Sequence, residues 1–150
     1  MTLANMTAEE TKRQNTEHCK SIAHELEAFA NGQMWRCDEC GEMFDDFECG
    51  ELWDGEHCPH CGEECDPEQL GVYDWLEDAL DITYTMNSAG QMMGASVLVA
   101  FGGPNIYVDT HDMRVKLYWW GDRAEWGISR DACDALDEAL VECFEAAKAS

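Results

Sequence analysis

Two short cysteine motifs, CDECG at residues 37–41 and CPHCG at residues 58–62, define the middle of the chain. Each motif places two cysteines three positions apart and follows the second with a glycine. Two such turns can present four thiolates in a tetrahedron without a preformed cavity. The glycine lets the chain turn sharply, so that backbone N–H groups can point back at the sulfurs. The sequence therefore predicts one metal ion, bound by Cys37, Cys40, Cys58 and Cys61.

These motifs resemble the knuckles of zinc ribbons and, more narrowly, of rubredoxins, whose second turn reads Cys-Pro-x-Cys-Gly. The resemblance covers about residues 35–63, and all four cysteines match it position for position. The segment between the motifs is shorter than in rubredoxins, so the resemblance implies zinc (Zn²⁺) rather than iron. Four thiolates leave no open coordination position, and we therefore expect a structural site. Cys49 and His57 stay open as substitutes for one thiolate, whereas His60 is expected to face outward and Cys65 to be an ordinary thiol.

Negative charge is concentrated around these motifs. The 150-residue chain has a formal net charge of −23, and residues 36–81 contain 17 Asp and Glu residues against one Arg. Zinc ribbons that bind nucleic acid need Lys and Arg to displace counterions from phosphates, so we expect no direct nucleic-acid binding. An excess of 16 negative charges equals the phosphate charge of about eight base pairs, which makes this segment a candidate mimic of nucleic acid. The simpler alternative is a solvated surface that keeps the protein soluble.

A mimic would bind the basic, nucleic-acid-binding surface of another protein. The YWW run at residues 118–120 would add an aromatic contact, because alternation along a strand places Trp119 on the face opposite its two neighbours. We expect Tyr118 and Trp120 to be packed. The candidate partner-binding residues are Asp45, Asp46, Glu48, Glu51, Asp54, Glu63, Glu64 and Trp119.

The N-terminal segment predicts an amphipathic helix over residues 7–31. Thr7 and Glu10 have the spacing of a capping box, and Asn31-Gly32 is a typical helix stop. Apolar side chains recur at helical spacing in a narrow stripe, which needs a partner surface to be stable. This stripe consists of Cys19, Ile22, Leu26 and Phe29.

The remaining chain predicts an α+β fold. Residues 66–69 have the signals of a helix start, which would bury Leu70, Tyr73, Leu76 and Leu80. Alternating segments between residues 82 and 128 predict four or five antiparallel strands, and a last helix capped by Ser129 would pack on them. The expected divisions are an N-terminal helix (1–32), an acidic zinc ribbon (33–66) and an α+β sheet domain (67–150).

Other properties limit where and how the protein acts. No apolar run is long enough to span a membrane, and no secretory signal is evident. Nine cysteines, four of them in metal-ligand spacing, favour a reducing, cytoplasmic setting. Residues 80–145 resemble short uncharacterised proteins of bacteria, phages and mobile elements, a resemblance that implies no activity.

The function that we expect is non-enzymatic: an acidic, zinc-binding inhibitor of a nuclease or phage-defence complex, of the anti-CRISPR or anti-restriction type. One alternative is a zinc-ribbon adapter that joins proteins in transcription or assembly. A second alternative is an enzyme that uses His and Cys residues outside the ribbon, such as His111. Against this alternative, the histidines are scattered along the chain, and no Ser or Cys occurs in a recognisable sequence pattern with a residue that could act as its general base.

Overall fold

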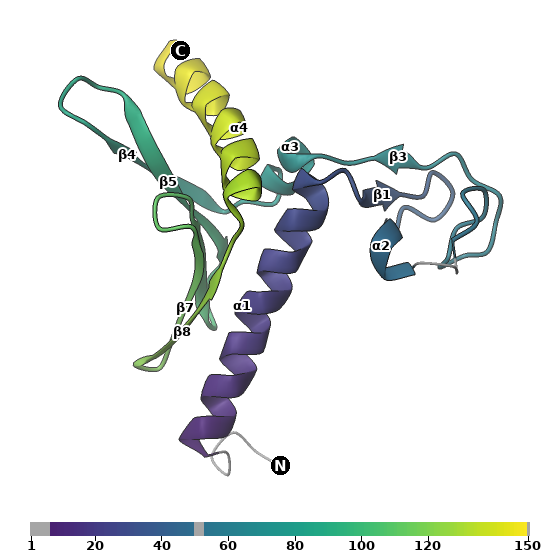
Figure 1. Ribbon diagram of the computed structural model, residues 1–150, viewed down its shortest axis with the longest axis horizontal. Helices are drawn as coiled ribbons and strands as arrows, with labels where there is room; N and C mark the ends of the chain where they lie inside the picture. The colour runs from purple at the N-terminus through teal and green to yellow at the C-terminus, as the bar shows by residue number, and fades with distance from the viewer. Residues whose placement is uncertain (1–6, 50–52, 150) are drawn as a thin grey trace.

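The computed structural model describes residues 7–49 and 53–149, without the side chains of Glu48 and Ala149, and shows an α+β fold (Figure 1). The helices are α1 (Ala8–Ala30), α2 (Asp46–Cys49), α3 (Val72–Leu76) and α4 (Arg130–Ala149). The strands are β1 (Met34–Arg36), β2 (Met43–Asp45), β3 (Glu68–Gln69), β4 (Asp81–Met86), β5 (Met92–Ala100), β6 (Asn105–Asp109), β7 (Arg114–Trp119) and β8 (Asp122–Gly127). None of the described helices has the length and apolar content needed to cross a membrane.

The larger sheet is the predicted antiparallel meander, with five strands in the order β4-β5-β6-β7-β8. Its register places apolar side chains opposite one another on a single face. Val108, for example, lies opposite Val97 of β5 and Val115 of β7, and all three are completely buried. The alternation seen in the sequence therefore marks the inner face of this sheet.

The two long helices cover that inner face (Figure 1). α1 lies against β7 and β8, whereas α4 lies against β5. The capping box of α1 is present, with the Glu10 backbone N–H donating to Thr7 Oγ1 over 3.1 Å. Leu26 of α1 and Leu136 of α4 are fully buried in the same hydrophobic core. The narrow apolar stripe of the N-terminal helix thus finds its partner surface in the sheet.

The prediction of a helix start at residues 66–69 is wrong. Glu68 and Gln69 form β3, which pairs antiparallel with β1, and the Gln69 side-chain amide donates to the Gly32 carbonyl over 2.7 Å. These pairings to a distant strand override the local capping signal, and α3 begins only after Gly71. Leu70 is buried as expected, but Tyr73 and Leu80 are exposed.

The β7–β8 connection also differs from expectation. Trp120 and Gly121 both have positive φ, 53° and 78°, and form the two-residue turn between the strands. Trp120 therefore leaves the strand, and its side chain is 90% exposed rather than packed. Trp119, at the end of β7, is partly buried against the core.

The core predicts that replacing two leucines by alanine has very different effects on the free energy of unfolding. Leu136→Ala should lower the free energy of unfolding by about 2–5 kcal/mol, because it opens a cavity in the shared core. Leu80→Ala, at a position that is 59% exposed, should change it by less than about 0.5 kcal/mol. Urea unfolding followed by circular dichroism measures both values, and similar losses would contradict this description of the core.

Candidate metal centre

The segment between α1 and α3, here termed the metal lobe (residues 33–70), contains both cysteine motifs. It is organised by a small antiparallel sheet in the order β2-β1-β3. The first motif connects β1 to β2, and the second lies between α2 and β3. The lobe follows the C-terminal end of α1 and extends away from the five-stranded sheet (Figure 1).

Both motifs fold into the same turn. In the first, the Gly41 N–H donates to the Cys37 carbonyl and the Cys37 N–H to the Glu42 carbonyl, each over 3.0 Å. In the second, the Gly62 N–H donates to the Cys58 carbonyl over 2.9 Å, and Cys58 donates to Glu63 over 3.0 Å. Gly41 and Gly62 both have φ +75°, a conformation that a residue with a side chain adopts only with strain.

Each turn directs backbone N–H groups at its first sulfur. Cys37 Sγ accepts from the Cys40 N–H at 3.4 Å and from the Glu39 N–H at 3.3 Å. Cys58 Sγ accepts from His60 and Cys61 over 3.3 and 3.4 Å. Chiefly because of the Cys40 N–H, the pKa of Cys37 falls to about 6, which favours the thiolate that a metal binds.

The four sulfur atoms form one cluster. The Sγ atoms of Cys37, Cys40, Cys58 and Cys61 all lie within 4.8 Å of one another. Cys37 Sγ lies 3.9 Å from Cys61 Sγ, and Cys40 Sγ lies 3.7 Å from Cys58 Sγ. A tetrahedron with metal–sulfur bonds of about 2.3 Å has sulfur–sulfur edges of about 3.8 Å. The cluster therefore fits a single metal ion held by four thiolates.

The other candidate ligands have different surroundings. His57 Nδ1 lies 2.8 Å from Asp54 Oδ2, and His60 Nε2 lies 3.2 Å from the Met43 carbonyl. Neither histidine belongs to the four-sulfur cluster, and nor does Cys49. Cys65 Sγ does lie within 4.8 Å of Cys37 Sγ, but in a separate group with an Asp38 oxygen rather than in the four-sulfur cluster. The geometry of the cluster therefore leaves Cys65 outside the set of four ligands.

Aromatic rings support the lobe from within. The ring of Trp53 lies 5.4 Å from that of Trp35 and 5.1 Å from that of Phe44, measured between centroids. Phe44 is buried, as are Met34 and Leu70. Apart from these residues and the first cysteine of each motif, the described part of the lobe has no buried side chain. The lobe consequently has a very small apolar core.

Some of the predicted partner-binding carboxylates also have structural roles. Asp54 accepts from the backbone N–H groups of His57 and Glu56, which together with the His57 ring lower its pKa to about 2. Asp45 Oδ1 accepts from the Phe47 N–H over 2.9 Å, and Asp46 Oδ2 accepts from Trp35 Nε1 over 2.9 Å.

The remaining predicted residues fall into three groups. Glu63 and Glu64 are exposed beside the second motif. Glu51 and the side chain of Glu48 lie outside the described residues. Trp119 belongs to the five-stranded sheet rather than to the metal lobe, and its ring packs partly against the core.

Six further carboxylates of the lobe are exposed, in addition to the predicted partner-binding residues. The sequence indicated them only through the overall negative charge of residues 36–81. A cleft of about 560 Å³ also lies between α1 and the lobe, where Glu17, Glu25 and Asp45 line it together with Met34 and Phe44. The six additional carboxylates are Asp38, Glu39, Glu42, Glu56, Asp66 and Glu68.

The cluster predicts which cysteines are needed for metal binding. Cys37→Ser should weaken metal affinity by roughly 100-fold or more, since even the loss of an outer-shell contact costs about 10- to 100-fold. Cys65→Ser should still bind one metal ion per chain with affinity close to that of the unchanged protein. Elemental analysis after dialysis against a competing chelator measures both, and equal metal loss in the two variants would contradict the four-sulfur assignment.

Comparisons with protein-family models, with curated proteins and with solved structures found no match for this chain. They lend no support to the resemblance between residues 80–145 and proteins of phages and mobile elements. The geometry and charge of the chain are therefore the evidence that bears on its function.

Proposed function

We propose that this protein is a non-enzymatic, zinc-stabilised acidic module that binds the basic, nucleic-acid-binding surface of another protein. One observation carries the proposal. Nine carboxylates of the metal lobe are exposed among the described residues, whereas no Lys or Arg occurs anywhere between residues 37 and 113. These nine are Asp38, Glu39, Glu42, Asp54, Glu56, Glu63, Glu64, Asp66 and Glu68.

Zinc is the metal that suits this site best. Four cysteine thiolates in a closed tetrahedral arrangement are typical of structural zinc, which needs no redox change and no open position. Iron binds similar sets of four cysteines and is the second choice. In this proposal zinc fixes the shape of a lobe whose carboxylates repel one another.

A rigid acidic surface is suited to a basic partner because its charges are already in place before binding. Electrostatic complementarity of this kind raises the association rate and excludes partners of like charge. The cleft beside α1 supports the proposal, since among the described residues that line it three carboxylates (Glu17, Glu25 and Asp45) outnumber one lysine (Lys20). A partner's Lys or Arg could place its aliphatic stem on the exposed side chain of Met43 and its charge at the carboxylates.

Inhibition of a nuclease or phage-defence complex in the cytoplasm is the narrower form of the proposal. Its support is the acidic composition alone. An adapter that docks by shape is the second candidate, because Phe47 of α2 is 78% exposed beside the acidic surface. His111, which the enzyme alternative would need in a pocket, has an exposed side chain.

Charge reversal distinguishes these candidates. The double variant Glu63→Lys/Glu64→Lys should capture basic nucleic-acid-binding proteins from a host lysate at least about tenfold less efficiently, because it replaces attraction by repulsion. A matched variant, Glu138→Lys/Glu145→Lys, makes the same charge change at exposed positions of α4 and should retain capture. Quantitative mass spectrometry of the captured proteins measures the difference.

Two further measurements, with added salt and with competing DNA, distinguish the candidates more clearly. Capture by the unchanged protein should fall as salt rises, and added double-stranded DNA should displace the captured proteins. Capture that resists both salt and DNA but is lost in Phe47→Ala would instead identify the adapter.

A further inference from the structure

Positive charge gathers in one place on this acidic molecule. Lys12 of α1, Arg114 of β7 and Arg123 of β8 line a single pocket of about 400 Å³, together with Thr16, Ala124 and Glu125. The whole chain has only nine Lys and Arg residues, so one third of its cations meet at this pocket. Lys12 and Thr16 belong to the N-terminal half of α1, whereas the metal lobe follows the C-terminal end of this helix.

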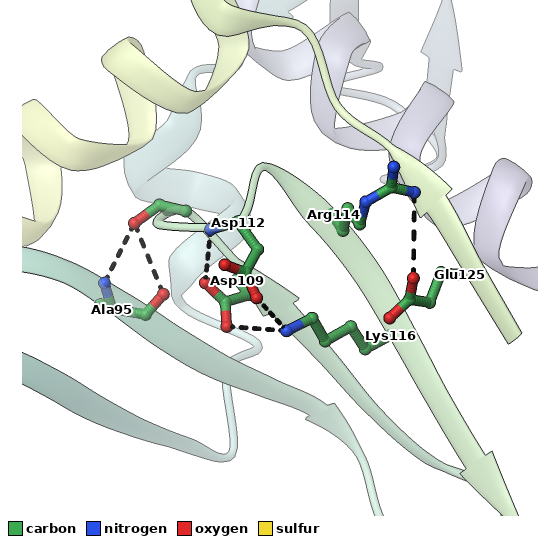
Figure 2. Close-up of polar contacts among 7 residues, drawn as sticks. Ala95, Asp109, Asp112, Arg114, Lys116 and Glu125 are labelled. Carbon is green, nitrogen blue, oxygen red and sulfur yellow. Dashed lines mark hydrogen bonds and ion pairs between the residues drawn. The ribbon is translucent and has the colours of Figure 1, made fainter. Parts of the chain in front are cut away.

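The pairing of these cations differs from that of a neighbouring lysine. Lys116 is neutralised by Asp109, 3.4 Å away, and by the closer Asp112 (Figure 2). Arg114 approaches Glu125 only to 3.9 Å, close to the limit for an ion pair. Lys12 and Arg123 form no ion pair with a carboxylate among residues 7–49 and 53–149. Two cations thus remain available at the same pocket in a chain with 32 Asp and Glu residues.

We propose that this pocket binds a phosphate group. Arg presents several N–H donors in a planar fork that matches phosphate oxygens bidentately, and Lys adds a point charge. Here two arginines from adjacent strands and one lysine from the covering helix line the same pocket, so a phosphate bound in it can be contacted from both the sheet and the helix. The pocket volume lies within the range of about 300–1,000 Å³ that is usual for sites of small ligands. The site is separate from the acidic surface of the proposed function.

The net charge of −23 does not prevent such binding. Lys12 and Ala30 are separated by about 27 Å along α1, at a rise of about 1.5 Å per residue. Charges in water are largely screened beyond about 8 Å at physiological ionic strength, so the metal lobe contributes little field at the pocket. Among the described residues, Glu125 is the one carboxylate that lines the pocket, against three cations. The lining residues therefore carry a net positive charge.

Aromatic rings next to the pocket suggest how a phosphate could be presented. Tyr118 lies directly opposite Arg123 in the β7–β8 ladder, and the exposed Trp120 occupies the turn between these strands. Such rings can stack on a nucleobase. A nucleoside diphosphate and a free inorganic phosphate both offer the phosphate oxygens that the three cations would contact. Comparing the binding of the two ligands distinguishes between them.

The test uses the metal-loaded full chain and inorganic pyrophosphate in a buffer of physiological ionic strength, with binding measured by isothermal titration calorimetry. The unchanged protein should bind one pyrophosphate per chain. Lys12→Gln/Arg123→Gln should weaken this binding about tenfold or more, since two charge-assisted contacts are removed. Arg130→Gln/Lys148→Gln removes the same charge at exposed positions of α4 that do not line the pocket, and should change affinity by less than about twofold.

Two results would overturn the phosphate site: no binding by the unchanged protein, or equal weakening in both double variants. All four positions are exposed, so similar urea midpoints for the two variants exclude misfolding as the cause. Both variants should capture basic proteins at the metal lobe as the unchanged chain does, which keeps this test apart from that of the proposed function.

A second titration uses adenosine diphosphate in place of pyrophosphate. Tighter binding than pyrophosphate, with the advantage lost in Tyr118→Ala, would support the site and identify a nucleotide as its ligand. Equal affinities would support the site and identify the phosphate group alone.

Discussion

The metal lobe must keep its shape with few apolar contacts and many like charges, and the four-cysteine cluster meets this constraint. Met34, Phe44 and Leu70 are the buried apolar side chains of its described part, apart from cysteine. Short strands of two or three residues cannot order such a segment alone. Binding of a structural metal supplies folding free energy directly, because the ligands are brought together only in the folded state. The arrangement of the exposed carboxylates therefore depends on the two cysteine turns.

The molecule separates its charges along α1. This 23-residue helix packs on β7 and β8 and leads into the metal lobe at its C-terminal end. The acidic surface is thus built on the lobe that contains the four-cysteine cluster, and the basic pocket on the five-stranded sheet with its large apolar core. The two surfaces differ in charge, in position and in what stabilises them, so one can be altered without changing the other.

Local patterns in the sequence were sufficient to predict much of the fold and the cysteine cluster. The capping box at Thr7, the strand alternation and the spacing of the cysteines each determine structure over a few residues, and the helix, the antiparallel sheet and the cysteine cluster are confirmed. β3 was missed because its conformation depends on pairing with β1, more than 30 residues away. The exposure of Trp120 depends on a turn in which this residue has positive φ, and the sequence did not indicate this because tryptophan rarely adopts such a conformation. The basic pocket joins residues more than 100 positions apart, which no single segment reveals.

The effect of metal on individual backbone amides tests the role of the four cysteines most directly. The chain would be treated with a chelator and then titrated with zinc while its ¹H–¹⁵N NMR spectrum is recorded. We expect the amide signals of residues 33–70 to be collapsed without metal and to become dispersed at one equivalent, while those of β4 to β8 stay unchanged. A metal lobe that is already ordered in the chelated chain, or a five-stranded sheet that unfolds with it, would contradict the central role assigned to the four cysteines.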